Sequence, residues 1–327
     1  FPKASFNQET LDYWQSKLRA TENAQPAIGT ISLGYFNFLK SLDIKPEAVA
    51  GHSYGEFTAL HASGVLSSND LFTISEKRGS IMANGCEVDG TMAVVSATEK
   101  QIIPYLNDSV QIANLNAPKQ IVISGERNAV YQAMEALKKN DFKVKEIAVA
   151  GPFHTPYFKT AQEPLMKAIK SLTFNNPKIP VYSNTTGKVY PQDSQNIGKL
   201  LNQHLLSPVL FSEEIEQMYE DGVRLFLEVG PNKVLTGLIN QILEGKSYKA
   251  LAVEGQGGGV KGILSAVGAI YAEGYHVNIE NLFEGRNCEF LTLFEAVKKS
   301  KEKTYSSSTV LLHGGGVRKL DETIALS

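Results

Sequence analysis

Short apolar runs alternate along this sequence with longer segments whose apolar residues recur at helical spacing, and this pattern predicts strands that alternate with helices. Helices are expected at 27–41, 56–64, 67–85, 157–172, 194–204, 212–221, 233–243 and 260–274. Strands are expected at 48–53, 179–184, 224–230 and 248–253. Strands and helices in this order form a mostly parallel sheet covered by helices on both faces, so the pattern indicates an α/β fold.

The pattern changes between residues 90 and 150, where it indicates a smaller unit. Strands are expected there at 91–97, 110–117, 120–125 and 142–149, with helices at 98–107 and 127–140. This β-α-β-β-α-β order is that of a ferredoxin-like unit. We therefore predict three parts, which are a large α/β core at 1–89 and 151–275, a ferredoxin-like insert at 90–150, and an irregular linker or appendage at 276–327.

Composition narrows the class of protein. Of the 327 residues, 43% are hydrophobic and 20% are charged, which is ordinary for a soluble globular protein. The formal net charge of -2 gives no basic field for nucleic acid, and no apolar run approaches the roughly 20 residues of a membrane span. The two cysteines, Cys86 and Cys288, form no CxxC motif and no disulfide framework, so we expect a cytoplasmic protein.

The sequence Gly51-His52-Ser53-Tyr54-Gly55 matches the G-x-S-x-G pattern of a nucleophile elbow. An apolar strand is expected before it and a helix after it, which favours a catalytic serine over a chance Gly-Ser turn. We expect both glycines to be required, because side chains at 51 and 55 would collide with the neighbouring strand and helix. The helix directs its N-terminal N–H groups at Ser53, and the Tyr54 N–H is a natural oxyanion donor.

A serine nucleophile needs a base, and His154 is the candidate among six histidines. It follows the last strand of the insert and precedes a helix, where α/β proteins place functional groups. His52 should point away from the attack direction, and His61 lies too far along the elbow helix. A capping or core histidine is the alternative interpretation of His154. Arg78 could bind a carboxylate through two parallel hydrogen bonds, although most helix arginines are simply solvated.

These residues together resemble the malonyl-CoA:acyl-carrier-protein acyltransferase family, in particular the acyltransferase domains of polyketide and polyunsaturated-fatty-acid synthases. The matching pieces appear in the order of the family and cover roughly residues 20 to 275; they are TENAQPAIG, GHSYGEFTALHASG, KRGSIM, NLNAPKQIVISG, GPFHTPYF, SPVLF and FLEVGPNKVLTGL. The resemblance implies an α/β-hydrolase-like large subdomain that carries a small ferredoxin-like insert, as the pattern above also predicts.

The resemblance also implies roles for individual residues. Ser53 would be the nucleophile and His154 its base, while Arg78 would bind the carboxylate of a malonyl group. The backbone carbonyl of His204 would orient the catalytic histidine in place of an aspartate. Substrate-binding positions would be Gln25 near the acyl pocket, His52, and Phe153, whose bulk favours malonyl over methylmalonyl.

The implied reaction is a ping-pong transfer through an acyl-Ser53 intermediate, with malonyl-CoA as donor and the phosphopantetheine thiol of an acyl carrier protein as acceptor. We expect no bound cofactor and no metal. Expected partners are the carrier protein and neighbouring synthase domains, with a ketosynthase upstream. We expect no binding to nucleic acid or to a membrane. Two alternatives from other classes stay open, which are a serine hydrolase of the α/β-hydrolase type and a non-catalytic scaffold domain of a synthase.

The chain departs from the family pattern at two places. Position 54 is Tyr where many malonyl enzymes have an aliphatic residue. The family begins with a strand and a GQGSQ-type loop that supplies a second oxyanion N–H, which this chain lacks, so we expect it to be the interior of a longer polypeptide. One oxyanion donor is worth on the order of 10² to 10³ in rate. HGGGV at 313–317 and GQGGGV at 255–260 resemble an oxyanion loop and a phosphate loop, and we interpret neither as functional.

Overall fold

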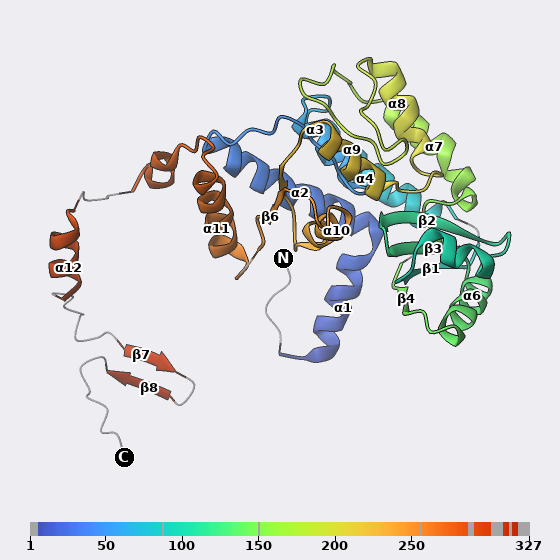
Figure 1. Cartoon of the computed structure of the whole chain (residues 1–327), viewed down its shortest axis with the longest axis horizontal. Coiled ribbons are helices and arrows are strands. Elements are labelled where there is room, and N and C mark those ends of the chain that lie inside the picture. The colour runs from blue at the N-terminus through green and yellow to red at the C-terminus, as the bar shows by residue number, and fades with distance from the viewer. Residues whose placement is uncertain are drawn as a thin grey trace. The chain divides into compact units, whose positions relative to one another are not determined.

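The computed structural model describes residues 6–86, 88–149, 151–255, 257–286, 291–301, 310–313 and 316–319. The chain divides into two compact units, Phe1–Asn278 and Ile279–Ser327 (Figure 1). Among the described residues, no helix combines the length and the apolar character that crossing a membrane requires.

The first unit has the mixed α/β composition that the sequence predicts. Its helices outside the insert are α1 (Gln8–Arg19), α2 (Thr21–Ser41), α3 (Gly55–Ala62), α4 (Ser68–Asn84), α7 (Lys159–Lys170), α8 (Ser194–Gln203), α9 (Phe211–Glu220), α10 (Val234–Ile242) and α11 (Gly259–Ala272). Strands β5 (Leu225–Glu228) and β6 (Lys249–Ala252) pair in parallel. Helix α1 was not expected from the sequence; the Asn7 side chain caps it, and none of its residues is buried.

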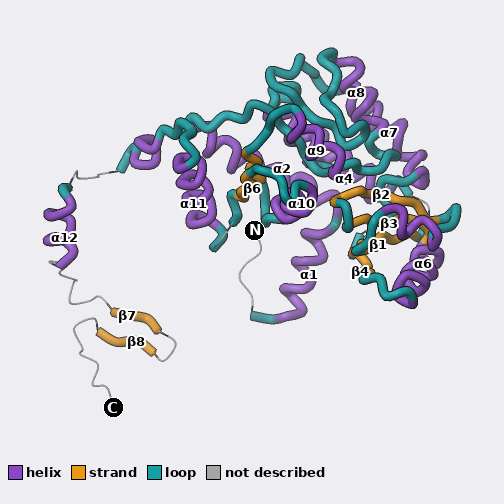
Figure 2. Tube along the Cα trace, viewed as in Figure 1, coloured by secondary structure: helices purple, strands orange, loops and turns teal. Residues whose placement is uncertain are grey.

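Two of the predicted parallel strands are wrong in extent. Segments 48–53 and 179–184 form only an isolated parallel bridge between Val49 and Val181. The ladder stops on one side at Pro180, which has no N–H to donate. Beyond Val181, hydrogen bonds that involve side chains replace the ladder. The Asn184 side chain donates to the Gly51 carbonyl, and the Asn184 N–H donates to the Glu56 carboxylate. Figure 2 shows that the chain between α7 and α8 runs as loops and turns.

The insert forms one four-stranded antiparallel sheet in the order β2-β3-β1-β4, which is the strand order of a ferredoxin-like fold. Its elements are β1 (Gly90–Val95), α5 (Glu99–Ile102), the 3-10 turn η1 (Ile103–Tyr105), β2 (Val110–Ala117), β3 (Gln120–Glu126), α6 (Arg127–Lys139) and β4 (Val144–Ile147). Helix α6 lies against this sheet (Figure 1).

Both faces of the insert sheet are covered, as the alternation along β1 shows. Ala93 and Val95 pack in the apolar cluster that contains the buried residues of α6. Met92 and Val94 point to the opposite face, where they pack with Phe153. Because side chains alternate between the faces of a strand, one sheet binds its own helix and also contacts the segment that carries His154.

The second unit contains the 3-10 turn η3 (Ile279–Phe283), helix α12 (Leu293–Lys301) and a hairpin of β7 (Val310–His313) with β8 (Gly316–Lys319). The sequence predicted an irregular linker here, so the helix and the hairpin are differences from that expectation. Cys288 and the segment 302–309 lie outside the described residues, as do positions 314 and 315 of the HGGGV motif. Position 256 of the GQGGGV motif lies outside them as well.

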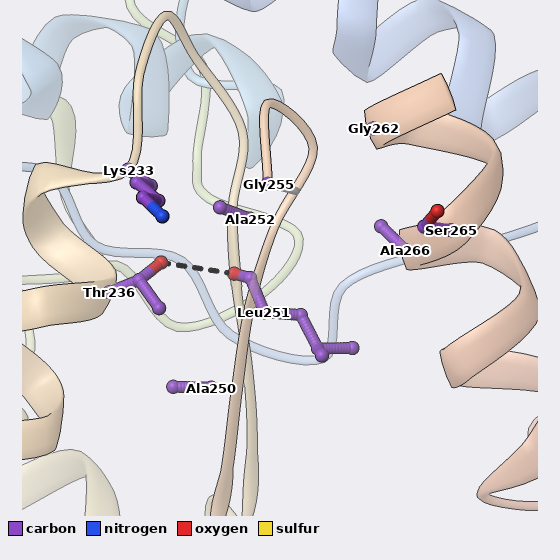
Figure 3. Close-up of a pocket in the computed structure, with 9 residues that line it drawn as sticks. All are labelled: Lys233, Thr236, Ala250, Leu251, Ala252, Gly255, Gly262, Ser265 and Ala266. Atoms are coloured by element: carbon purple, nitrogen blue, oxygen red, sulfur yellow. Dashed lines mark hydrogen bonds between the residues drawn. The ribbon is translucent and has the colours of Figure 1, made fainter. Parts of the chain in front are cut away.

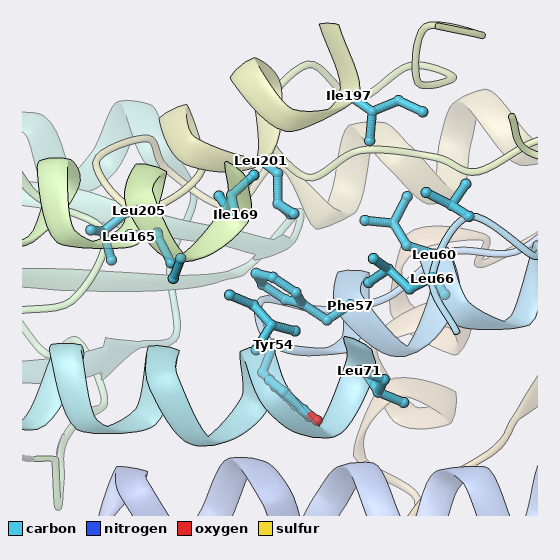
Figure 4. Packing of buried hydrophobic residues seen from close by; sticks show 14 of the residues in the cluster. Tyr54, Phe57, Leu60, Leu66, Leu71, Leu165, Ile169, Ile197, Leu201 and Leu205 are labelled. Carbon is cyan, nitrogen blue, oxygen red and sulfur yellow. The ribbon is translucent and has the colours of Figure 1, made fainter. Parts of the chain in front are cut away.

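The core around the serine turn is built from four helices. Phe57 and Leu60 of α3 are fully buried and pack with Leu71 of α4, Leu165 of α7 and Leu201 of α8. Figure 4 shows the side chains of α3 facing those of α7 and α8. Burying each of these large side chains stabilises the fold by about 1.5–3 kcal/mol, so the start of α3 is held in a rigid frame.

The two elbow glycines give a prediction about stability. A methyl group at Gly51 would lie 2.0 Å from the Gly55 carbonyl carbon, whereas a methyl group at Gly55 meets nothing within 4 Å. We expect Gly51→Ala to lower the free energy of unfolding by about 1–3 kcal/mol. Gly55→Ala, the matched control, should change it by less than about 1 kcal/mol, because Ala is the better helix former. Urea denaturation measures both values, and equal losses in the two variants would contradict this account.

Candidate active site

Ser53 stands at the turn where the chain enters α3. Its φ of 51° lies in the left-handed region, which few non-glycine residues adopt and which marks strained turns at functional sites. Gly51 is required as predicted, because its Cβ would also lie 2.5 Å from the Glu56 nitrogen. The prediction for Gly55 is wrong, because a Cβ at this first residue of α3 would meet nothing within 4 Å.

Ser53 and His154 meet although 101 residues separate them. The Ser53 Oγ lies 2.8 Å from His154 Nε2, and His154 Nδ1 lies 3.2 Å from the carbonyl oxygen of His204. A carbonyl can only accept, so Nδ1 carries the proton and Nε2 is left to accept from the serine hydroxyl. Burial and the nearby Arg78 charge lower the pKa of His154 to about 3, which keeps the imidazole neutral at pH 7.

The segment that carries His154 is held by the insert. Its residue Phe153 accepts a hydrogen bond of 3.1 Å from the Ser124 hydroxyl of β3 at its carbonyl oxygen. The Phe153 ring packs against Phe158, with ring centroids 5.2 Å apart. His154 itself has a φ of 60°, so both members of the Ser–His pair stand in left-handed backbone conformations. The insert therefore helps to hold His154 where the serine can reach it.

The Tyr54 backbone belongs to the serine turn, whereas the Tyr54 side chain is buried in the core. Its N–H makes no hydrogen bond within the described part of the chain. The phenol reaches the Ser75 hydroxyl at 2.6 Å, and the ring stacks on Phe57 with centroids 6.1 Å apart. A Cβ at Gly29 would lie 2.2 Å from the Tyr54 oxygen, so the glycine makes room for the tyrosine at position 54.

Arg78 is a buried cation beside the elbow, and only 2% of it is exposed. Its Nη1 donates to Gln25 Oε1 at 2.7 Å, and the guanidinium lies 5.3 Å from the centre of the Phe57 ring. Burial lowers the pKa of Arg78 to about 10, so the group remains charged at neutral pH. Its Nη2 is buried without a hydrogen-bond partner among the described residues. A buried cation with spare donors is suited to bind a carboxylate.

The His52 side chain contacts the insert. Its Nε2 lies 2.7 Å from the Asn116 Oδ1 of β2, and its ring meets Phe211 edge-on at 5.3 Å. Burial lowers the pKa of His52, so the ring is neutral. This agrees with the expectation that His52 does not serve as the base.

Three buried polar residues near Ser53 and His154 were not singled out from the sequence. They are Asn184, Glu56 and Glu214. Asn184 Oδ1 accepts the Ser53 N–H at 2.6 Å, and Asn184 Nδ2 donates to the Gly51 carbonyl at 2.8 Å and also to Glu214. All three side chains are fully buried. The available signal was the position of Asn184 at the end of a predicted strand, where α/β folds gather functional groups.

A separate pocket of about 220 Å³ lies between β6, the start of α10 and helix α11. Figure 3 shows Lys233 and Thr236 from the α10 side opposite Ser265 and Ala266 of α11. None of the predicted site residues lines it. Within the described residues, no group of three His, Cys, Asp or Glu side chains is arranged to hold a metal ion.

Comparisons with known proteins agree on one family. Residues 6–257 match the family described as acyl transferase domain. A malonyl CoA-acyl carrier protein transacylase of Bacillus subtilis is 37% identical over 246 residues, which are 72% of this chain and 77% of that protein. One polypeptide of the polyunsaturated fatty acid synthase from a Thraustochytrium species is 30% identical over 75% of this chain, but this match spans only 9% of that polypeptide.

Solved structures show the same likeness. The acyltransferase domain from the second module of the salinomycin polyketide synthase superposes with a TM-score of 0.77 at 29% identity, over 83% of this chain and 64% of that one. A malonyl CoA-acyl carrier protein transacylase from Clostridium perfringens gives a TM-score of 0.73 at 33% identity, over 80% of this chain and 82% of that one. The family match, the relatives and the fold agree, and the chain belongs to the acyl transferase domain family.

Proposed function

We propose that this chain transfers a malonyl group from coenzyme A to the phosphopantetheine thiol of an acyl carrier protein, through an ester of Ser53. The observation that carries the proposal is the Ser53 Oγ–His154 Nε2 contact of 2.8 Å, with a buried arginine beside it. Relatives named malonyl CoA-acyl carrier protein transacylase support the choice of donor and acceptor.

In the first half-reaction Ser53 Oγ attacks the thioester carbonyl while its proton passes to His154 Nε2. The carbonyl oxygen becomes an oxyanion, and the Tyr54 N–H is placed to donate to it. The carbon–sulfur bond then breaks, the coenzyme A sulfur takes the proton from Nε2, and malonyl-Ser53 remains. The pantetheine thiol reverses these steps: its proton passes to Nε2, its sulfur attacks the ester, and Ser53 Oγ leaves and recovers the proton.

The His204 carbonyl fixes the imidazole for both half-reactions, because it holds the proton on Nδ1 throughout. A serine hydrolase would normally place a carboxylate at that nitrogen. The carbonyl contact therefore supports the transferase over the hydrolase alternative. The presence of Ser53, His154 and Arg78 in one site likewise supports an active enzyme over a non-catalytic scaffold.

Arg78, Gln25 and Phe153 select which acyl group the site accepts. Gln25 Oε1 accepts the 2.7 Å hydrogen bond from Nη1 at one edge of the guanidinium and so fixes its orientation. The spare Nη2 donor supports binding of the free malonyl carboxylate. Phe153 precedes His154 and narrows the space for an α-methyl group, a difference worth about 1–3 kcal/mol.

The expected setting of the reaction belongs to the same proposal. Relatives include large synthases, which supports neighbouring synthase domains as partners in addition to the carrier protein. The low cysteine content supports a cytoplasmic location, where disulfides are rare. The division into a core of 1–89 and 151–275, an insert of 90–150 and an appendage of 276–327 is proposed on the same grounds.

A first prediction concerns the covalent intermediate. Intact-protein mass spectrometry after mixing with malonyl-CoA should show one added malonyl group, located on Ser53 by peptide mapping. Ser53→Ala should show none, while Ser63→Ala, a control at the end of α3, should acylate like the wild type. An adduct that persists in Ser53→Ala would contradict the proposed nucleophile.

A second prediction concerns the buried arginine. Arg78→Gln removes the charge, and a charge-assisted hydrogen bond is worth about 1.5–3 kcal/mol. The acylation rate with malonyl-CoA should fall roughly 10- to 100-fold relative to the rate with acetyl-CoA. Arg224→Gln, an exposed arginine, is the control and should leave the ratio unchanged. A ratio that is unchanged in Arg78→Gln, in protein shown to be folded by circular dichroism, would remove Arg78 from acyl selection.

A third prediction concerns pH. A base with an ordinary histidine pKa of about 6.5 would be almost entirely protonated at pH 5, and acylation would slow about 30-fold. The pKa of His154 is lowered to about 3, so the imidazole stays neutral over this range. The Ser53 acylation rate should therefore change less than about twofold between pH 7 and pH 5 in stopped-flow or quench measurements. A fall by the larger factor would show that burial does not hold His154 neutral.

A further inference from the structure

Glu56 is a buried carboxylate three residues after the nucleophile, and the proposed reaction does not use it. Its side chain is 0% exposed. One carboxylate oxygen, Oε1, accepts the Asn184 N–H at 2.6 Å. The other, Oε2, lies 3.2 Å from His204 Nδ1 and has no hydrogen bond of good geometry among the described residues. A buried acid with one oxygen aimed at an imidazole needs an explanation, because such groups are costly.

The contacts of Glu56 with Asn184 and with His204 connect it to Ser53 on one side and to His154 on the other. Asn184 accepts the Ser53 N–H and so leads to the nucleophile. His204 accepts the His154 Nδ1–H at its carbonyl and so leads to the base. The His204 ring also lies against the His154 ring, with centroids 5.1 Å apart and planes at 49°. Glu56 is thus one residue removed from Ser53 on one side and from His154 on the other.

We propose that Glu56 is a positioning residue, which holds the His204 side chain, and through it the His154 imidazole, and which as an anion favours proton transfer from Ser53. The inference rests on the Ser53–His154 step of the proposed function. His154 gains a positive charge when it takes the serine proton. A carboxylate behind the His204 ring attracts that charge, and nearby opposite charges are known to favour the charged form of a histidine.

The groups that face Glu56 decide when it carries a charge. They come from several elements and are Arg78, Tyr190, His204 and Glu214. Burial raises the pKa of Glu56 to about 8, although the Asn184 N–H, the Tyr190 and Ser183 hydroxyls and the Arg78 charge all lower it. Tyr190 and His204 stay neutral, because burial raises the pKa of the phenol and lowers that of the imidazole. Burial and the Glu56 charge raise the pKa of Glu214 well above its ordinary value.

The Glu56 charge is among the causes that raise the pKa of Glu214, so an ionised Glu56 favours the neutral form of Glu214. Arg78, whose pKa is about 10, remains charged through the same range. The proposal predicts that Ser53 becomes more nucleophilic as pH rises through about 8, by roughly three- to tenfold. Below that pH the rate should be level, since His154 does not titrate there.

Glu214 supplies a matched control for Glu56. Both carboxyl groups are fully buried and both bind Asn184, but of the two only Glu56 faces His204 in the described structure. Glu56→Gln keeps an acceptor for the Asn184 N–H and removes the charge. Glu214→Gln removes the other carboxyl group and leaves the contact between Glu56 and His204.

The test measures the rate at which a fluorophosphonate labels Ser53 between pH 6 and pH 9. Ser53 Oγ forms the bond to phosphorus, fluoride leaves, and the serine proton passes to His154, so no malonyl group or carrier protein is involved. The wild type should show the rise near pH 8, and Glu56→Gln should show a level profile. Glu214→Gln should keep the rise. His204→Gln, which retains the carbonyl and removes the ring, should reduce its size.

The outcomes separate this inference from the proposed function. A rise that persists unchanged in Glu56→Gln, or that is lost equally in Glu214→Gln, overturns the role of Glu56. Failure of the wild type to label at any pH also overturns it, since Ser53 would then not be activated. Labelling with the predicted profiles together with no malonyl adduct would retain Glu56 and refute malonyl transfer. If Glu56→Gln does not fold, the reduced rise in His204→Gln carries the test alone.

Discussion

The hydrogen bond from the Ser53 N–H to the Asn184 side chain is the interaction on which the site depends. Ser53 has a φ of 51°, and Asn184 holds it there while also binding the Gly51 carbonyl on the other side of the turn. A buried, fully bonded amide can specify one conformation where a chain of this kind would otherwise relax. The cost is that the parallel ladder between the two segments is reduced to one bridge, because the groups that would extend it bind side chains instead.

The second constraint comes from the insert. Its sheet contacts the core on the face opposite α6, where Ser124 binds the Phe153 carbonyl and Asn116 binds His52. The nucleophile therefore stands on the large subdomain, and the segment that carries the base is braced by the small one. A relative movement of the two by about 1 Å would break the 2.8 Å contact between Ser53 and His154, so their packing is part of the catalytic geometry.

Much of the fold and of the site could be predicted from the sequence. The features that could not be predicted were missed for physical reasons. The elbow motif and the α/β pattern indicated Ser53, the helices and the insert, and the family resemblance indicated the pairing of His154 with the His204 carbonyl. The roles of Glu56 and Asn184 were missed, because their contacts join positions 128 and 131 residues apart and follow no local period. The hairpin of β7 and β8 was missed because its segment is short and rich in glycine. Helix α1 was missed because it has no buried face.

The central claim is that the acyl group on Ser53 passes to a thiol and not to water. The most direct measurement isolates the malonylated chain, mixes it with a holo acyl carrier protein, and follows both intact masses through a single turnover. The account predicts that the malonyl mass leaves this chain and appears on the carrier protein, faster than it is lost in buffer alone. Loss at the same rate with and without the carrier protein, with free malonate as the product, would contradict it.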